Sequence, residues 1–354
     1  MHNSQTIQVL FFIGFLVLIC GLLVLDLGVF EKKDKVVSMK RALCTTLVWI
    51  GLALGFGLVI YFFGNQIHGI EDSQALAEVS AKYHEKGFNS TDIPFEQAAH
   101  QYNKRLTLEY ITGYLIEYSL SIDNIFVMIL IFSTFAIPPQ YYKRVLMWGI
   151  LGAVVMRFIF IFAAGALIAK YEWILLVFGL FLMYSGTKMF IERNKKEEMN
   201  PEKNPLIKFC SKRWNVTNTI DDHSFFKKIN GARYITPLFL CMITIEFTDV
   251  LFAVDSIPAV FSVTKDPYIV FFSNIFAIMG LRSLFFLISG MVQKFRFLKI
   301  GLAFLLFVIG VKMIIESEPI NFEIPIVASL LIIIGILAVS ILASMLIPEK
   351  KEKN

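Results

Sequence analysis

Long apolar runs recur along this chain and constrain its fold more than any other feature. Each run is about 20 residues long, the length that an α-helix needs to cross a hydrocarbon core of about 30 Å. Nine such windows can be read from the sequence: 7–29, 46–64, 107–132, 144–168, 172–190, 235–257, 268–290, 298–315 and 323–347. Hydrophobic residues make up 56% of the chain, more than a soluble core of this size needs. We therefore expect an all-α, polytopic protein with about nine transmembrane helices in contact with a lipid bilayer.

The windows and the segments between them divide the chain into six parts. The predicted parts are two N-terminal transmembrane helices (1–64), an extracytoplasmic loop (65–106), a first three-helix unit (107–190), a charged cytoplasmic loop (191–232), a second three-helix unit (233–316), and a last helix with a basic cytoplasmic tail (317–354). The first window is too long for a cleaved signal peptide, so we expect it to remain as a helix.

The distribution of basic residues predicts the orientation in the membrane. With nine crossings, the two termini lie on opposite sides. If the N-terminus is outside, the segments on the cytoplasmic side carry twenty-three of the 33 Lys and Arg residues, and the segments on the other side carry six. Cytoplasmic loops usually carry the excess of Lys and Arg. We therefore expect an extracytoplasmic N-terminus and a cytoplasmic C-terminus.

The predicted extracytoplasmic loop is expected to be partly helical, with a helix beginning near Pro94. It contains His68, His84 and His100, which are separated by sixteen residues each. This is not a known spacing of metal ligands, so the sequence favours exposed histidines without a binding role.

Charged positions recur in the same order in the two three-helix units. IEYSLSIDNI aligns with TDVLFAVDSI, so that Glu117 meets Asp249 and Asp123 meets Asp255. Further on, RFIFIFAAG aligns with RSLFFLISG, and SGTKMF aligns with IGVKMI. Because each unit has three helices, the second copy must enter the membrane from the opposite side. Inverted repeats of this kind are typical of secondary transporters, whose binding site lies near the bilayer midplane.

Five carboxylates lie within these predicted helices, where an ionised side chain is costly. They are Glu117, Asp123, Glu246, Asp249 and Asp255. A charge at the centre of a membrane helix costs about 2.5–3.5 kcal/mol to insert on translocon scales. We therefore expect these side chains to face the bundle interior, to pair with cations or to be protonated, but not to face lipid.

Helical periodicity groups the polar residues by face. At about 100° per residue, Glu117, Ser121 and Asn124 share one face of the first helix of their unit. Asp249 and Ser256 share the corresponding face of the equivalent helix in the second unit.

Asp123 and Asp255 point well away from these two faces. A single site can collect all the carboxylates only if the helices bend or unwind, or if two faces are buried. Pro258 removes the hydrogen bond to the carbonyl of Val254 and so predicts a break beside Asp255. A helix broken at the midplane would also offer backbone carbonyls as ligands.

Carboxylate, amide and hydroxyl oxygens are hard ligands that suit Mn²⁺, Mg²⁺ or Ca²⁺ rather than copper or zinc. The predicted metal ligands are Glu117, Asp123, Asn124, Glu246, Asp249 and Asp255. Ser121, Ser256 and Asp26 are candidates for the transport pathway. Arg157 and Arg282 are expected to offset negative charge, either as static ion pairs or as cations that compete with the ion in one conformation.

The stretches EYSLSIDNIF, WGILGAVVMRFIFIFAAGALI and IEFTDVLFAVDSIPAVF together resemble the TerC family of bacterial membrane proteins. The resemblance extends over most of the chain, and no acidic position departs from the family motifs. It implies a bacterial inner-membrane location and an association with manganese efflux. It also implies a link to tellurium resistance, although the sequence shows no cluster of thiols or thioethers that could bind a tellurium species.

The expected function is the export of a hard divalent cation, with Mn²⁺ as the transported ion, by alternating access. A Ca²⁺ or Na⁺/H⁺ transporter is the alternative within this class, and a non-transporting scaffold linked to tellurite resistance is another. An intramembrane aspartyl protease would need a pair such as Asp123 and Asp255, but its YD and GxGD motifs are missing. No P-loop is present. We expect no enzymatic activity, no permanently bound cofactor and no nucleic-acid partner, and a homo-oligomer is compatible with the sequence.

Overall fold

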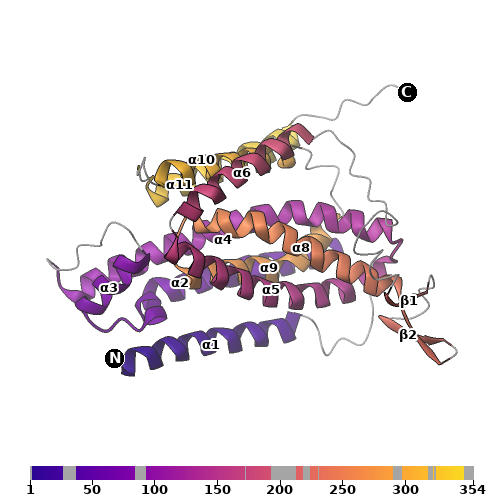
Figure 1. Ribbon diagram of the computed structural model, residues 1–354, viewed down its shortest axis with the longest axis horizontal. Coiled ribbons are helices and arrows are strands. Elements are labelled where there is room, and N and C mark those ends of the chain that lie inside the picture. Colours follow the sequence, from indigo (N-terminus) through magenta and orange to yellow (C-terminus); the bar gives the residue numbers. More distant parts are fainter. Residues whose placement is uncertain are drawn as a thin grey trace.

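A computed structural model describes residues 2–26, 37–83, 93–171, 173–192, 213–217, 224–229, 231–289, 297–317, 322 and 324–346. The helices are α1 (His2–Asp26), α2 (Met39–Phe63), η1 (Gly64–His68), α3 (Ser73–Tyr83), α4 (Phe95–Thr134), η2 (Pro139–Tyr141), α5 (Tyr142–Lys170), α6 (Trp173–Ile191), α8 (Pro237–Phe261), α9 (Pro267–Ser289), α10 (Leu298–Glu316) and α11 (Ile326–Leu346) (Figure 1). Three short strands complete the described elements: β1 (Asn215–Val216), β2 (Phe226–Ile229) and β3 (Ala232–Ile235).

The predicted all-α, polytopic class is confirmed. Within the described residues, 8 helices are long and apolar enough to cross a membrane. They match eight of the nine predicted windows, and the remaining window, 298–315, forms α10. The helix of the window 107–132 begins earlier than expected, at Phe95, so that α4 has 40 residues. At a rise of about 1.5 Å per residue it is about 60 Å long, twice the hydrocarbon thickness.

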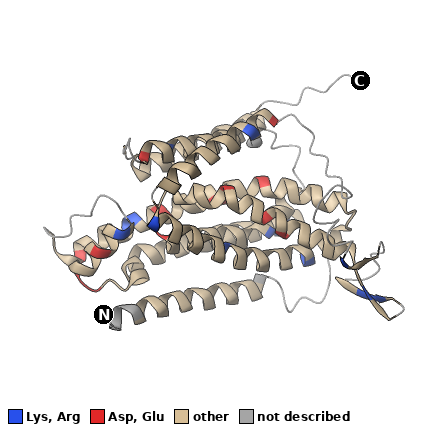
Figure 2. Ribbon diagram, in the orientation of Figure 1, with Lys and Arg blue, Asp and Glu red and all other residues tan. Residues whose placement is uncertain are grey.

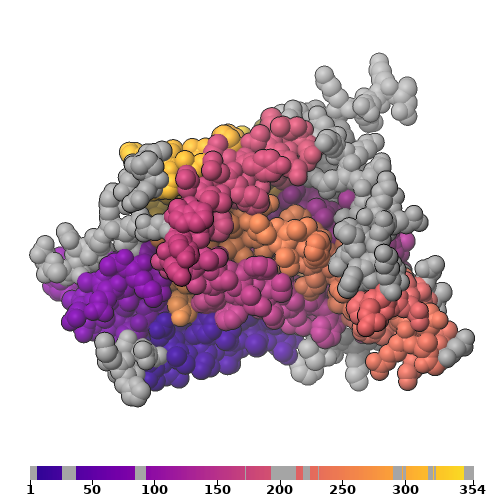
Figure 3. All heavy atoms as spheres, viewed as in Figure 1, coloured from indigo at the N-terminus to yellow at the C-terminus, as the bar shows by residue number. Residues whose placement is uncertain are grey.

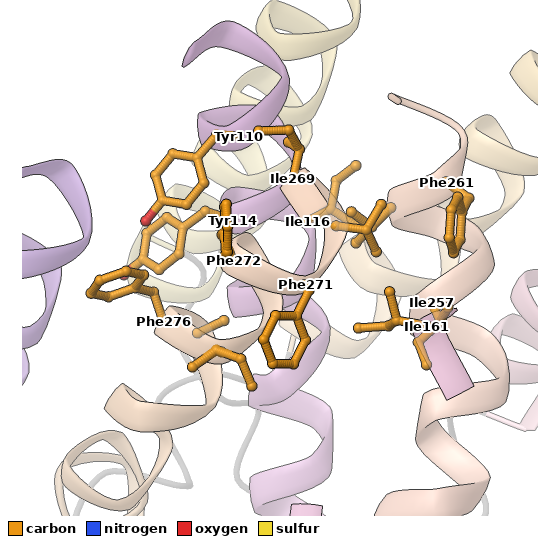
Figure 4. Packing of buried hydrophobic residues seen from close by; sticks show 14 of the residues in the cluster. Tyr110, Tyr114, Ile116, Ile161, Ile257, Phe261, Ile269, Phe271, Phe272 and Phe276 are labelled. Carbon is orange, nitrogen blue, oxygen red and sulfur yellow. The ribbon is translucent and has the colours of Figure 1, made fainter. Parts of the chain in front are cut away.

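Helix α9 lies at the centre of the bundle and is buried on all sides, as expected of a helix that is apolar all round. It packs along α4, α2 and α5. Phe272 and Phe276 of α9 meet Phe56 of α2, Phe276 also meets Tyr110 of α4, and Phe271 packs beside Phe272; part of this aromatic cluster is shown in Figure 4. Such rings add about 0.5–1.5 kcal/mol per pair beyond their buried area.

The outer helices present apolar side chains to the surroundings. Helix α1 runs along the outside of the bundle (indigo in Figure 3), and only a small part of it is buried. Its exposed side chains include Leu10, Ile13, Val17 and Leu25. A soluble protein rarely exposes so large an apolar surface, so these positions fit contact with lipid.

Helices α6 and α10 pair closely through small residues, which let helix backbones approach within a membrane. Gly179 packs on Gly310, and Gly186 packs on the backbone of Ala303. In the alignment of the two units, Gly186 corresponds to Gly310 and Gly179 corresponds to Ala303. Exchanging the units therefore maps one contact onto the other, as a twofold relation would. The inverted relation of the whole units stays a prediction.

The described parts of the segments expected on opposite sides of the membrane lie at opposite ends of the bundle (Figure 1). The α3 end, as we call it, holds η1, α3 and the α8–α9 connection, which His68 and Asp266 join. The sheet end holds the three strands in the order β1-β3-β2, with β1–β3 parallel and β2–β3 antiparallel. This sheet was not anticipated, because its segment reads as a charged linker. Which end faces the cytoplasm remains a prediction.

Candidate functional site: a buried charge cluster

A buried arginine lies between two of the predicted acidic residues at the centre of the bundle. Arg157 of α5 forms an ion pair with Glu117 of α4, and its Nη2 lies 3.4 Å from Oδ1 of Asp249 in α8. The exposed fractions are 0% for Arg157 and Glu117 and 5% for Asp249. Charges removed from water this completely are stable only when they are paired and hydrogen-bonded. We call Glu117, Arg157 and Asp249 the charge cluster.

Two further polar side chains complete the surroundings of Arg157. Its Nη1 donates to Oδ1 of Asn274 at 2.6 Å and to Oγ of Ser256 at 3.3 Å. Asn274 belongs to α9 and was not among the predicted site residues. The only signal that could have found it is a single amide within an apolar window, which periodicity alone does not connect to an arginine 117 residues away.

The predicted face of α4 is confirmed, and it carries polar atoms without partners. Glu117, Ser121 and Asn124 are all buried. Glu117 Oε2, Ser121 Oγ and Asn124 Nδ2 have no hydrogen-bond partner among the described residues. Buried polar atoms are nearly always satisfied, so a row of three such atoms on one face needs a reason. Two of the three, Glu117 Oε2 and Ser121 Oγ, are oxygen atoms of the kind that can bind a cation, whereas Asn124 Nδ2 is a donor.

Asp123 and Asp255 lie away from these faces, as the periodicity predicted. Asp255 is half-buried and accepts a hydrogen bond of 2.9 Å from Ser185 Oγ of α6, and Asp123 is also half-buried. The expected break at Pro258 is wrong, because α8 continues as an α-helix to Phe261. Pro258 removes one hydrogen bond, to the carbonyl of Val254, but the helical bonding continues beyond it, because the amide of Ser262 donates to the carbonyl of Pro258 at 3.0 Å. Two buried faces, rather than an unwound helix, therefore accommodate the acidic residues.

Glu246 occupies a place next to the charge cluster where α5 has a glycine. A Cβ atom at Gly152 would collide with both carboxylate oxygens of Glu246. Glu246 is half-buried and one turn before Asp249 on α8. The missing side chain at position 152 thus makes room for the carboxylate.

The second predicted arginine, Arg282 of α9, lies beside a small cavity. The cavity has a volume of about 10 Å³, roughly the space for one water molecule, and Asp249 and Arg282 are the charged residues that line it. Its other lining residues, such as Ile150 and Ile278, are apolar. Asp249 therefore borders both Arg157 and this cavity. The side chain of Asp26 lies outside the described residues.

The carboxylates are not gathered into a single metal site in this arrangement. Within the described residues, no three His, Cys, Asp or Glu side chains are placed to hold one ion together. Figure 2 shows acidic positions spread along α4 and α8 in the interior of the bundle. The structure brings together Glu117, Arg157, Asp249 and Ser256, and it places Asp255 on another interface.

A second polar network lies at the α3 end, and it corrects the prediction for His68. His68 is buried, and its Nε2 lies 2.7 Å from Oδ2 of Asp266. Thr264 Oγ1 donates to Glu109 Oε2 at 2.7 Å, and Arg105 Nε donates to Glu109 Oε1 at 3.1 Å. We call these five residues the cap network. The imidazole is buried because Tyr83 and Tyr268 pack against it.

The other two histidines differ from His68. His100 is exposed, as predicted, whereas His84 lies outside the described residues.

Comparisons with known proteins place the chain among membrane proteins. The profile of the "Integral membrane protein TerC family" matches residues 102–352. An "Uncharacterized membrane protein STKORF319" of Myxococcus xanthus is 42% identical over 334 residues, covering 94% of this chain and 91% of the relative. A "Putative membrane-bound redox modulator Alx" of Escherichia coli K12 is 38% identical over 344 residues, covering 96% of each chain. The protein of the same name from Salmonella typhi is also 38% identical, covering 96% of this chain and 95% of the relative. No solved structure matches the chain.

Proposed function

This chain belongs to the TerC family of integral membrane proteins, and we propose that it exports a hard divalent cation, with Mn²⁺ as the favoured ion, across the bacterial inner membrane. The observation that carries the proposal is the charge cluster with the unpartnered atoms beside it. A membrane protein retains buried acidic residues at a cost of several kcal/mol, and a transported cation is a sufficient reason for that cost.

The donor chemistry supports a hard cation. Glu117, Ser121 and Asp249 offer only oxygen, and Asn124 adds an amide whose oxygen and nitrogen are exchanged by a flip of the side chain. Hard oxygen donors of this kind suit Mn²⁺, Mg²⁺ and Ca²⁺. Cys241 is buried in α8, one turn before Ile245, but it has no place in the charge cluster.

The proposed transport cycle is alternating access of the two three-helix units, with the N-terminus outside and the C-terminus in the cytoplasm. Glu117 and Asp249 come from equivalent positions of the two units and meet at Arg157. The contacts of α6 with α10 favour a twofold relation between the units, as in transporters with inverted repeats.

The printed names of the Alx relatives assign them a redox role. For this chain we propose transport instead, because the distinctive feature is an oxygen-rich charge cluster. The described cysteines, Cys20, Cys44 and Cys241, are each free thiols. A Ca²⁺ or Na⁺/H⁺ transporter is the alternative that the same buried acids would serve.

The test measures ion flux into liposomes that hold the purified protein and an ion-sensitive dye. Mn²⁺, Mg²⁺, Ca²⁺ and Zn²⁺ are compared for the native chain, Glu117→Gln and Asp249→Asn. The matched control is Glu96→Gln, an exposed position near the start of the same helix as Glu117. We expect Mn²⁺ flux that falls at least tenfold in both cluster variants and is unchanged in the control. No divalent flux from the folded native chain would overturn the proposal and favour sodium–proton exchange.

A further inference from the structure

We propose that Arg157 acts as a built-in competitor of the transported ion: its guanidinium occupies the space between Glu117 and Asp249, and the ion binds only when Arg157 is displaced. The inference rests on the proposed function and concerns the regulation of that same site. It assigns the arginine a role in setting ion affinity rather than a purely structural one.

The position of Arg157 is the first support. Its side chain is fully buried and contacts carboxylates from two different helices, with Asn274 of a third helix holding its Nη1. A divalent ion bridging the same two carboxylates would need the volume and the negative charge that the guanidinium now takes. Two cations cannot share that space without strong repulsion, since burial weakens dielectric screening.

The hydrogen bonding of Arg157 is the second support, because it is incomplete. Nη1 has three partners and Nη2 reaches Asp249 at 3.4 Å, whereas Nε has no hydrogen-bond partner. A guanidinium fixed for structural reasons usually forms a bidentate pair with a carboxylate and satisfies its whole fork of donors. Here the fork is engaged mainly through one nitrogen, which is the arrangement expected of a group that must leave.

The unpartnered oxygen of Glu117 is the third support. Glu117 uses only Oε1 to contact Arg157, and its Oε2 is buried without a hydrogen bond. Ser121 Oγ on the same face is likewise unpartnered. Arg157 therefore neutralises the site when it is empty without saturating its donor atoms. The remaining oxygens are left for an ion that arrives as the arginine departs.

The test is the binding of Mn²⁺ alone to the purified full-length protein. Binding is measured by titration calorimetry and by the rise in melting temperature that Mn²⁺ causes. Arg157→Gln removes the competing charge, and Arg157→Lys retains a charge without the fork. Arg105→Gln is the control, because it removes an arginine of α4 at the α3 end, outside the charge cluster. We expect Arg157→Gln to bind Mn²⁺ at least about tenfold more tightly than the native chain, which corresponds to 1.4 kcal/mol.

The sign of the change decides between the two roles of Arg157. A competitor gives tighter binding in Arg157→Gln, a smaller gain in affinity in Arg157→Lys, and no change in Arg105→Gln. Weaker or unchanged Mn²⁺ binding in Arg157→Gln would overturn the inference while leaving the proposed function intact. If neither the native chain nor any variant bound Mn²⁺, the proposed transport of Mn²⁺ itself would fail. If Arg157→Gln does not fold, Arg157→Lys decides. Lys cannot maintain the contacts of Nη1 and Nη2 together, so a competitor role predicts that Arg157→Lys binds Mn²⁺ more tightly than the native chain. Native-like or weaker binding by Arg157→Lys would then overturn the competitor role.

Discussion

Gly179 of α6 and Gly310 of α10 each face the backbone of the other. A Cβ atom on Gly310 would lie 2.6 Å from the carbonyl oxygen of Gly179, and one on Gly179 would lie 3.0 Å from the carbonyl oxygen of Gly310. Backbone atoms cannot retreat as the end of a flexible side chain can, so these two positions accept no side chain without moving a helix.

Gly310→Ala is therefore expected to separate α6 from α10 and to lower the melting temperature of the purified protein. Overpacking of this kind costs about 1–3 kcal/mol. The control is Gly335→Ala in α11, where no atom lies within 4 Å of the added carbon. Equal melting temperatures for the two variants would show that α6 and α10 do not pack as described.

Gly152→Ala is expected to disturb transport more than stability. The new methyl group meets the carboxylate of Glu246, which is the far end of a flexible side chain and can move away. We expect lower Mn²⁺ flux with little change in melting temperature. A second substitution, Glu246→Ala, should remove the collision, so that adding Gly152→Ala to it costs nothing further. Additive losses of flux in the double variant would contradict this contact.

His68→Ala should destabilise the protein, because it leaves Asp266 buried with one partner fewer. Asp266 keeps its hydrogen bond from the Tyr268 amide at 2.9 Å but loses the imidazole. A buried polar group deprived of a partner costs about 1–3 kcal/mol. Thermal unfolding of His68→Ala is compared with that of His100→Ala, whose side chain is exposed. If both variants melted at the native temperature, the described pair would not contribute to folding.

Lys265, in the α8–α9 connection, predicts a dependence of stability on pH. Burial lowers the pKa of its ammonium group, although nearby Glu316 acts in the opposite direction. Between the lowered pKa of Lys265 in the folded protein and its ordinary pKa in the unfolded chain, the unfolded chain binds more protons than the folded one. Folding therefore becomes more favourable as the pH rises through this range. Lys265→Met should raise the melting temperature near about pH 7, and the gain should shrink toward about pH 10. A gain that is independent of pH would point to packing rather than to charge.

Periodicity predicted the parts of this structure that are local in sequence. The apolar windows predicted the membrane-spanning helices. A spacing of four and three residues placed Glu117, Ser121 and Asn124 on one buried face. Both results follow from the 3.6-residue turn of a helix and from the length needed to cross a membrane. The same reasoning placed Asp255 away from that face, where it bonds to Ser185.

The contacts that could not be predicted join residues that are far apart in the chain. Asn274 meets Arg157 across 117 residues, and His68 meets Asp266 across 198 residues. Nothing in either local sequence names its partner, because such pairings are set by how whole helices pack. The break expected at Pro258 failed for a different reason: the proline removes one hydrogen bond of α8, and the helix continues past it to Phe261.

The length of α4 has a consequence for how the two polar regions can move. Glu109 of the cap network and Glu117 of the charge cluster lie on this one uninterrupted helix, eight residues apart. At a rise of about 1.5 Å per residue they are about 12 Å apart along a nearly rigid rod. Any rigid-body tilt or slide of α4 that displaced Glu109 would therefore also displace Glu117. The positions of the cap network and of the charge cluster are therefore coupled through α4 as long as this helix stays straight.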